Sequence, residues 1–390
     1  MKKLYKLFPL LLALTLVFAM LAGCASNAAT SEPAKEPADT AAGTPAETET
    51  AQTPASEIRV AFVLDSSGTD GSWGQANYEA AVASREAMGL DDEHCIIMEN
   101  IDAYSADAES VFEMLCQQGY DLIFGCTSGY TSAISAVAAR HPEVYFAQFE
   151  GATSENSLAY SCADYNAIFL CGYTVARMSE SPDLGFIACQ PQASVIRALN
   201  SFAAGARYAN EDATVKVLWI NSWYDPAKEK EATNTLINEG FTGIGFYGGT
   251  QAVAAACEEA GVYTNGFNVD MSESGPDAVL TSFVWKWDAV FNQVITMVRE
   301  GKWSNETLFP GITDGACDIA PINEKVVPAD IVSDVNALRE KVINHEIEAF
   351  TAPVYDNAGN CVLEEGQQFS MEDYIGMTFL LDNVIGSLPE

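Results

Sequence analysis

Short apolar runs alternate with amphipathic stretches along most of the chain between residues 58 and 300. The apolar runs are rich in Val, Ile, Phe and Tyr and are bounded by glycine and polar residues, which is typical of buried strands. The strands predicted in this way are 59–64, 95–99, 121–125, 144–149, 158–162, 184–188, 214–220, 243–247, 262–268 and 278–283.

The stretches between these strands repeat apolar residues at helical spacing. They predict helices at 74–88, 106–118, 130–140, 167–178, 194–208, 226–239, 251–260 and 286–300. Local signals agree, because Asp225 precedes Pro226 as an N-cap and Gly240 follows the end of the same helix. Strands that alternate with helices indicate an α/β fold whose parallel sheets are covered on both faces.

One sheet of all these strands would be unusually large, so two lobes of about five strands each are favoured. We expect the chain to cross between the lobes near 164–166 and to return near 282–287. The predicted division is lobe 1 at 58–165 plus about 284–390, and lobe 2 at 166–283, with an irregular segment from 309 wrapping the lobes. The carboxyl ends of both sheets should then face each other across a hinge, where open α/β sheets bind ligands.

The amino-terminal residues predict a secretory leader. Lys2, Lys3 and Lys6 precede an uncharged apolar stretch at 7–21, which is short for a membrane span. Leu21-Ala22-Gly23-Cys24 resembles the lipobox of bacterial lipoproteins, so we expect a signal peptide at 1–23 and a lipid on Cys24. The alternative is a cleaved leader followed by an incidental cysteine. Residues 24–57 are rich in Ala, Thr, Pro and Glu and predict a disordered tether on the extracytoplasmic face of the membrane.

The charge balance narrows the class of partner. The chain has 19 Lys and Arg against 54 Asp and Glu, a formal net charge of −35. Such a surface repels nucleic acid and anionic lipid, so no nucleic-acid partner is expected. Nine cysteines remain after Cys24 without a C-x-x-C pair, and we expect mostly free, buried thiols. One or two disulfides remain the alternative.

Residues that would indicate catalysis or metal binding are missing from the sequence pattern. His94, His141 and His345 are scattered, and none has a partner at metal-ligand spacing. There is no nucleophile-elbow motif and no phosphate-binding loop of the Walker type. A G-x-G-x-x-G run at 243–248 lies inside a predicted strand and is interpreted as chance. We therefore expect no catalytic residue, no metal and no cofactor.

Tryptophans gather where predicted strands end. Trp73 follows a polar loop after the first strand, Trp223 follows the 214–220 strand, and Trp285 and Trp287 lie just past the last one. A pocket walled by aromatic rings suits a flat ligand, since stacking one base on an aromatic side chain contributes roughly 1–3 kcal/mol. The alternative is that each tryptophan packs in a core.

Other strand-end residues complete the candidate ligand site. Tyr130, Phe149 and Gly249 lie at or just after the ends of predicted strands. Asp270 offers a carboxylate that can accept two hydrogen bonds, although a helix cap or a hinge ion pair would also explain it. Arg197 lies early in the 194–208 helix, where it could reach the cleft or pair with an acidic residue.

Several of these segments resemble one protein family. They read D-G-S-W-G-Q at 70–75, D-P-A-K-E-K at 225–230, G-G-T at 248–250 and, more loosely, G-F-N-V-D at 266–270. They are similar to the basic membrane protein family of ABC-transporter substrate-binding lipoproteins, which contains purine nucleoside receptors, over residues 58–303. The resemblance also brings Gln75 into the candidate site. One departure is that Trp285 stands where the family's T-S-x-x-K motif ends in lysine.

The resemblance implies a fold and a function. The fold would be two Rossmann-like lobes joined by a hinge, as in type I periplasmic binding proteins. The chain would bind a purine base or a nucleoside and deliver it to an ABC permease and its ATPase. The aromatic departure at Trp285 favours a free base or a related heterocycle. The alternatives are a receptor of the same fold that reports to a signalling kinase, and an extracellular enzyme that acts on nucleosides.

Overall fold

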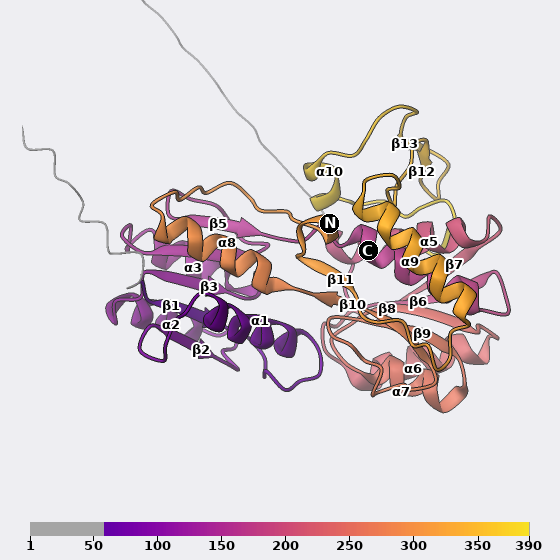
Figure 1. Cartoon of the computed structure of the whole chain (residues 1–390), viewed down its shortest axis with the longest axis horizontal. Coiled ribbons are helices and arrows are strands. Elements are labelled where there is room, and N and C mark those ends of the chain that lie inside the picture. The colour runs from indigo at the N-terminus through magenta and orange to yellow at the C-terminus, as the bar shows by residue number, and fades with distance from the viewer. Residues whose placement is uncertain (1–57, 390) are drawn as a thin grey trace, which may run out of the picture. The chain divides into compact units, whose positions relative to one another are not determined.

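The computed structural model describes residues 58–389 and has two α/β lobes (Figure 1). The predicted strands and helices up to residue 300 are all present. The predicted signal peptide at 1–23, the lipidated Cys24 and the tether at 24–57 lie outside the described residues. None of the helices in the described part is long and apolar enough to span a bilayer.

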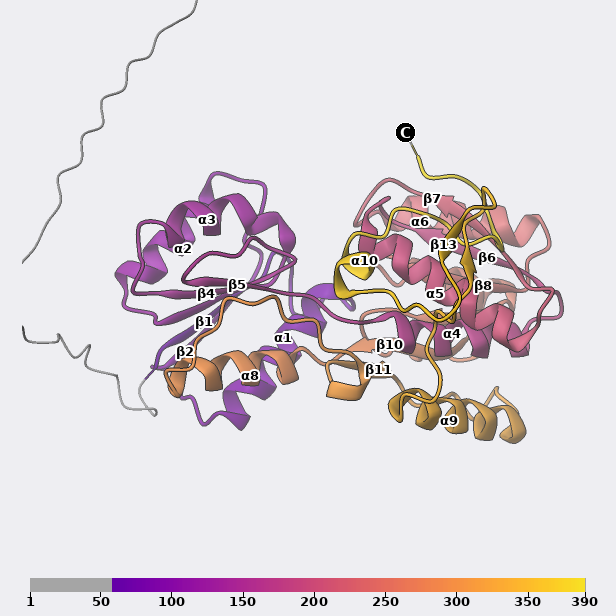
Figure 2. The ribbon, with the colours of Figure 1, turned by 90° about the horizontal axis from the view of Figure 1, so that it is seen from above.

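Lobe 1 has a fully parallel sheet in the order β2-β1-β3-β4-β5. These strands are β1 (Val60–Val63), β2 (Cys95–Met98), β3 (Leu122–Gly125), β4 (Tyr145–Phe149) and β5 (Ser157–Tyr160). Helices α1 (Trp73–Ala87) and α8 (Trp287–Arg299) cover one face, and α2 (Asp107–Gln117) and α3 (Thr131–Ala138) cover the other (Figure 2). The strands are buried on both sides, which explains their continuous apolar sequences.

Lobe 2 has a larger sheet in the order β11-β10-β9-β8-β6-β7-β14, in which only β11 runs antiparallel to its neighbour. The strands are β6 (Asp183–Ala188), β7 (Thr214–Trp219), β8 (Gly243–Tyr247), β9 (Tyr263–Gly266), β10 (Val279–Trp285), β11 (Cys317–Ile319) and β14 (Val384–Ile385). Helices α4 (Tyr165–Met178) and α5 (Ala193–Ala209) pack on it, as do α6 (Pro226–Asn238) and α7 (Ala252–Ala260).

Helices α4 and α5 approach each other unusually closely. A Cβ atom on Gly172 would lie 2.1 Å from the carbonyl oxygen of Phe202, and one on Gly205 would lie 2.0 Å from that of Phe169. Only glycine fits at either position, because any side chain would push the neighbouring backbone away. The two helices that begin beside the hinge therefore form one tightly packed block.

The chain passes between the lobes three times. The first passage follows β5, the second joins β10 to α8, and the third brings residues 308–311 beside the first through bridges of Leu308 with Tyr160 and of Gly311 with Ala163. The two sequence-predicted crossings lie at these first two passages. The third lies within the segment predicted to be irregular.

The carboxyl-terminal part differs from the predicted division. Lobe 1 retains α8, but residues 312–389 pack on lobe 2, because β11 pairs with β10 and β14 pairs with β7. This part contains α9 (Ala329–Ile343), β12 (Val354–Tyr355), β13 (Cys361–Leu363) and α10 (Met371–Ile375). The assignment of 312–389 to lobe 1 is therefore wrong.

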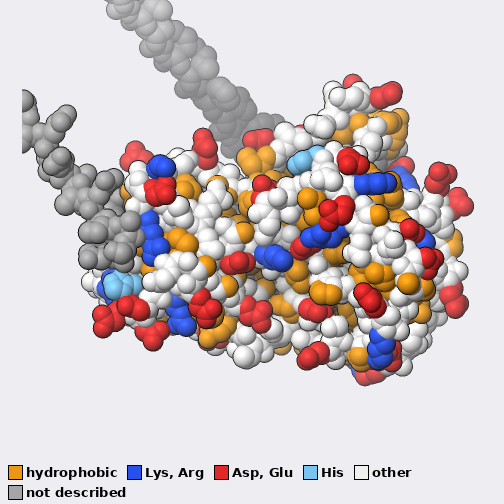
Figure 3. Space-filling view, viewed as in Figure 1, with side chains coloured by type: hydrophobic (Ala, Val, Ile, Leu, Met, Phe, Trp, Pro, Cys, Tyr) orange, Lys and Arg blue, Asp and Glu red, His pale blue; other side chains and the backbone are white. Residues whose placement is uncertain are grey.

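The thiols follow the prediction. Eight cysteines of the described chain are free and buried, and Cys361 on β13 is free and exposed, so no disulfide is present in this part of the protein. Acidic side chains are spread over the viewed face of both lobes (Figure 3), as the sequence charge requires. Across residues 58–389, no group of three or more His, Cys, Asp or Glu side chains is placed to hold a metal ion.

Candidate ligand-binding site between the lobes

Four aromatic rings meet where the carboxyl ends of the two sheets face each other. The ring of Trp73, at the start of α1, lies 4.9 Å from Phe149 and 6.0 Å from Trp285, measured between ring centroids. Trp287 lies 6.1 Å from Trp73 and stacks on Trp285 at 4.7 Å with an angle of 17° between the planes. We call these four residues the aromatic cluster. Because Trp285 ends a lobe 2 strand and the other three belong to lobe 1, the cluster joins both lobes.

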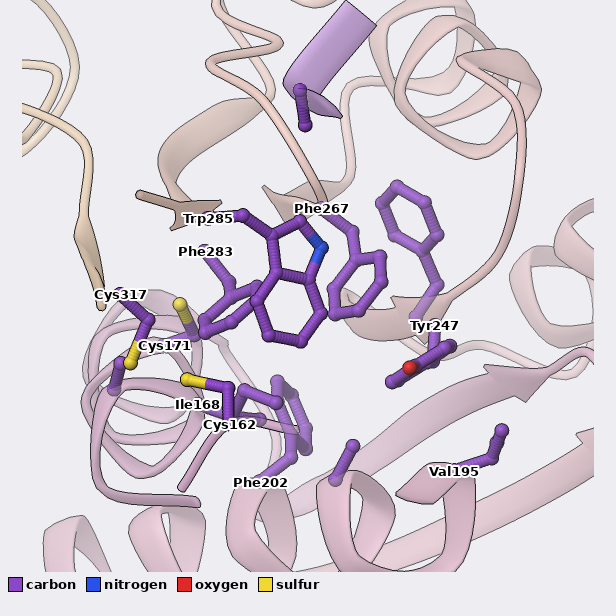
Figure 4. Packing of buried hydrophobic residues seen from close by; sticks show 14 of the residues in the cluster. Cys162, Ile168, Cys171, Val195, Phe202, Tyr247, Phe267, Phe283, Trp285 and Cys317 are labelled. Carbon is purple, nitrogen blue, oxygen red and sulfur yellow. The ribbon is translucent and has the colours of Figure 1, made fainter. Parts of the chain in front are cut away.

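Trp285 is fixed from the lobe 2 side. Its ring lies between Phe283, at 4.5 Å, and Phe267, at 6.1 Å, in edge-on contacts (Figure 4). Its indole N–H donates to Oδ1 of Asn268 over 2.6 Å. The donor of this indole is therefore already paired, and packing on all sides fixes the orientation of its ring.

Two hydrogen bonds link the loop before Trp73 to lobe 2. Asn268 donates from Nδ2 to Oγ of Ser72 over 2.8 Å, and Gln251 donates from Nε2 to the carbonyl of Gly71 over 3.1 Å. Within the loop, the carboxylate of Asp70 accepts from the backbone N–H groups of Ser72, Gly74 and Gln75 at the start of α1. The loop is thus rigid and holds Trp73 toward the opposite lobe.

Several strand ends turn sharply at this edge of the lobes. Glu150 after β4, Asn221 after β7 and Asn268 after β9 have φ values of 47°, 51° and 73°. Asparagine adopts this left-handed region readily, but glutamate does so at a cost. Strained backbone of this kind is concentrated at ligand sites, and these positions follow strands whose ends form the crevice.

A buried polar group lies beside the aromatic cluster. The Nε of Arg197, which is 1% exposed, donates to Oδ1 of Asp164 over 2.6 Å. Burial raises the pKa of Asp164, and Arg197 opposes this rise. Glu150 is half-buried and accepts from Oγ of Ser161 over 3.2 Å, and burial raises its pKa against the same opposing charge. One guanidinium therefore stabilises two carboxylates near the hinge.

Two polar atoms of this region remain available. The indole N–H of Trp287 and Oδ2 of Asp164 are buried without a hydrogen-bond partner among the described residues. Buried polar atoms are usually paired, because an unpaired one costs about 1–3 kcal/mol. A ligand between the lobes could accept from Trp287 and donate to a carboxylate.

The structure brings together four of the predicted site residues: Trp73, Phe149, Trp285 and Trp287. Arg197 is adjacent but makes the ion pair that was its alternative, so its contact with a ligand would be indirect. Arg197 lies near the start of α5, and its guanidinium meets Asp164, the N-cap of α4, in the first passage between the lobes.

Five other predicted residues lie elsewhere or face outward. Tyr130 is fully buried in the second core of lobe 1, where its hydroxyl donates to the carbonyl of Ile101 over 2.6 Å. Gln75 donates along α1 to Glu79, and the exposed carboxylate of Asp270 accepts from the backbone of Ser272.

The remaining two are in the loops of lobe 2. Trp223 is 37% exposed, and no ring of the described chain packs against its indole. The backbone N–H of Gly249 donates to the buried carboxylate of Glu229, and a Cβ there would meet the carbonyl of Trp223 at 2.3 Å. Gly249 thus has a role in packing two loops together.

Sequence reasoning missed several residues of the site. They are Ser72, Glu150, Tyr160, Asp164, Tyr247, Phe267 and Asn268. Most lie at the carboxyl end of a predicted strand or just after it, and that position was the available signal. Asp164 and Arg197 are 33 residues apart, so their pairing had no local sequence pattern.

One cavity lies away from the aromatic cluster, on lobe 2. It has a volume of about 930 Å³ and is lined by α4, α5 and the carboxyl-terminal part, including Tyr165, Tyr208, Phe350, Phe369 and Tyr374. A smaller cavity of about 250 Å³ adjoins it beside the hinge and shares Tyr165 and Tyr374.

Relatives among known proteins agree with this architecture. The chain is 29% identical to a purine-binding protein of Brucella abortus over 335 residues, which are 86% of this chain and 95% of the relative. It is 31% identical to a putative ABC transporter glucose-binding protein of Haloferax volcanii over 73% of this chain and 70% of the relative. A nucleoside-binding protein of Lactococcus lactis is 24% identical over 52% of this chain and 64% of its own length.

Solved structures share the two-lobed fold. An ABC transporter solute-binding protein from Conexibacter woesei matches with a TM-score of 0.62 and 21% identity, over 75% of this chain and 98% of that one. A transcriptional activator of the comK gene from Bacillus halodurans matches with a TM-score of 0.64 and 23% identity, over 74% and 99%. These likenesses confirm the predicted periplasmic-binding-protein fold.

The family model for PnrA-like ABC transporter substrate-binding proteins matches residues 57–351, which are most of the chain. This match confirms the predicted family and, with it, a protein that binds a solute and does not catalyse a reaction. A substrate-binding protein of this family works outside the cytoplasm. The chain therefore belongs to the Bmp family of PnrA-like ABC transporter substrate-binding proteins.

Proposed function

We propose that the protein binds a purine base or nucleoside between its lobes and delivers it to an ABC permease. The single observation that carries this proposal is the aromatic cluster, in which Trp73 of lobe 1 meets Trp285 of lobe 2 at 6.0 Å. The planes of these two indoles stand 87° apart, so a flat ring bound between the lobes would stack on one indole and meet the edge of the other. A stack worth roughly 1–3 kcal/mol, an edge contact and a few hydrogen bonds together approach the about −8 kcal/mol of a micromolar complex.

The polar atoms beside the cluster suit a purine. The free N–H of Trp287 fits a ring nitrogen or carbonyl acceptor, and the half-buried carboxylate of Glu150 fits an N–H donor. The purine-binding relative from Brucella abortus and the nucleoside-binding relative from Lactococcus lactis support the same ligand class.

Glucose is the competing ligand, because the relative from Haloferax volcanii is a putative glucose-binding protein. A hexose has hydroxyl groups around its whole rim, and each would need a hydrogen-bond partner when buried. The aromatic cluster supplies mostly carbon surface at this point. We therefore favour the heterocycle over the sugar.

Isothermal titration calorimetry tests the ligand class. Protein purified without refolding, and freed of carried-over ligand by dialysis, is titrated with adenine, guanine, hypoxanthine, their nucleosides and glucose. We expect a dissociation constant at or below about 1 µM for at least one purine and no heat for glucose. Binding of glucose alone, or of nothing in the panel, contradicts the purine proposal and leaves the family assignment intact.

We also propose that the protein is anchored to the membrane by a lipid on Cys24. The leader and the Ala22-Gly23-Cys24 sequence support this attachment. In cells that express the full chain, labelling with a fatty-acid analogue should mark the wild type and not Cys24→Ser. Equal labelling of both would contradict the anchor, and the membrane fraction should lose the protein in the variant.

A further inference from the structure

The last part of the chain lies outside the family match, which ends at residue 351. We call residues 352–389 the C-terminal extension. It is firmly attached to lobe 2, since Met377, Leu380, Leu381 and Val384 are all buried and β14 adds a strand to the edge of the sheet. Figure 1 shows it in yellow over α5 and β7.

One face of α5 is devoted to this extension. Arg197 donates to the carbonyl of Tyr374, Asn200 donates to that of Phe379, and Arg207 pairs with Asp382 over 2.6 Å. The three α5 residues are three and seven positions apart, which places them along one side of a helix. The helix thus binds the extension from the hinge end to its far end.

Arg197 is the contact nearest the hinge, and it binds more than the extension. It donates to Asp164 over 2.6 Å and to the carbonyl of Cys162 over 3.3 Å, both on the first passage between the lobes. Its guanidinium also lies 5.4 Å from the ring centre of Phe309, on the third passage. One buried side chain therefore contacts two of the three passages between the lobes.

The extension holds this arrangement from the other side. The carbonyl of Tyr374 accepts from Arg197 over 3.1 Å, and the ring of Tyr374 stacks on Tyr165 at 4.0 Å with planes only 5° apart. Tyr165 follows Asp164 directly and is the first residue of α4. Tyr374 thereby fixes both partners of the buried ion pair.

We infer that Arg197 is a positioning residue for ligand binding, held by the C-terminal extension, which sets how the two lobes are oriented at the hinge. A planar guanidinium can donate to Asp164, Cys162 and Tyr374 at once, whereas a lysine ammonium on this stem cannot reach all three in the same geometry. The inference rests on a ligand site between the lobes, as in the proposed function, but not on the ligand being a purine.

Four variants of the full chain test this role. Arg197→Lys keeps the positive charge but loses the planar guanidinium with its several donors. Arg197→Met loses both the charge and the donors. Tyr374→Ala removes the stack on Tyr165. Arg207→Met is the matched control, because it breaks an arginine–carboxylate pair between the same helix and the same extension, far along α5 from the hinge. Arg197→Lys and Tyr374→Ala keep the test decisive if Arg197→Met does not fold.

The first measurement needs no ligand. Hydrogen–deuterium exchange in the passages at 161–164 and 308–311 should be about ten-fold faster in both test variants than in wild type, because Arg197→Lys loses hydrogen bonds from a charged group and Tyr374→Ala loses the stack that holds Tyr165. Arg207→Met should match wild type there. Exchange in β1 and β3, remote from the hinge, corrects for any global loss of stability.

The second measurement is the dissociation constant for the tightest purine of the calorimetry panel. It should rise about ten-fold in Arg197→Lys and Tyr374→Ala and stay within about two-fold in Arg207→Met. Unchanged exchange and unchanged affinity in both test variants overturn the inference. If wild type binds no purine but hinge exchange still accelerates, the ligand proposal fails and the positioning role stands.

Discussion

Asn268 connects the two lobes, because its Nδ2 donates to Oγ of Ser72 over 2.8 Å while its Oδ1 accepts from the indole of Trp285. The left-handed backbone of Asn268, with φ of 73°, lets one side chain reach both partners from the end of β9. The orientation of a lobe 2 aromatic is thereby tied to a lobe 1 loop.

Replacing Ser72 by alanine should weaken ligand binding with little effect on folding. The hydroxyl accepts the interlobe hydrogen bond but makes no side-chain cap on α1, so about 1 kcal/mol of closure energy is lost, a roughly five-fold rise in the dissociation constant. Calorimetry against the tightest ligand measures this. The hydroxyl of Ser67, in the same loop, hydrogen-bonds to Thr69 within lobe 1, so Ser67→Ala should behave as wild type.

Trp73 and Trp223 should differ sharply in their effect on affinity. Trp73 is part of the aromatic cluster, so Trp73→Ala should lower affinity by about ten- to one-hundred-fold through the loss of a stacking face. Trp223→Ala should change it by less than about two-fold, because its exposed indole lies outside the cluster. Equal losses in the two variants would mean that closure brings Trp223 onto the ligand.

Tyr130 should matter for stability and not for binding. Tyr130→Phe loses the hydrogen bond to the carbonyl of Ile101, at a cost of about 1 kcal/mol in the free energy of unfolding. Urea denaturation measures this loss, and the dissociation constant should be unchanged. A large drop in affinity would contradict this prediction and show that Tyr130 takes part in ligand binding.

Glu229 should make the protein less stable as pH rises. Burial raises the pKa of this carboxyl from 4.5 to about 6, while the hydroxyl of Thr250 and the backbone of Gly249 oppose the shift. The folded state therefore holds a proton that the unfolded state has released between these two values. The contribution of Glu229 to the free energy of unfolding is therefore largest below pH 4.5. It falls by about 2 kcal/mol as the pH rises through 6.

Urea denaturation of wild type and Glu229→Gln between pH 4.5 and 7.5 measures this contribution. The variant should lack this part of the pH dependence and should equal or exceed wild type in stability at pH 7.5. Parallel pH curves for the two proteins would show that the charged form of Glu229 is fully compensated in the fold.

The sequence allowed much of the fold to be predicted, since the strands of both lobes are continuous apolar runs and the helices between them are amphipathic. The C-terminal extension was beyond that reasoning. Strands β12 and β14 have only two residues each, too few to show a period, and their positions depend on pairing with β13 and β7.

Part of the ligand site could also be predicted from the positions of the strands. Trp73, Phe149 and Trp285 could be found because parallel strands end at one edge, but that rule does not give the direction of a side chain. Tyr130 follows a strand in the same way, yet a short 3-10 turn at Ser128–Tyr130 points its ring into the outer core of lobe 1. The ion pair of Arg197 could not be predicted, because its partner Asp164 lies 33 residues away in the sequence.

The thiol of Cys361 gives experimental access to the C-terminal extension. It is the one exposed cysteine within residues 58–389, and it lies on β13. A maleimide dye should therefore attach to this strand of the native protein without engineered mutations, while the buried thiols stay unreacted. The fluorescence of such a probe would report in real time whether the yellow segment of Figure 1 shifts as solute is captured.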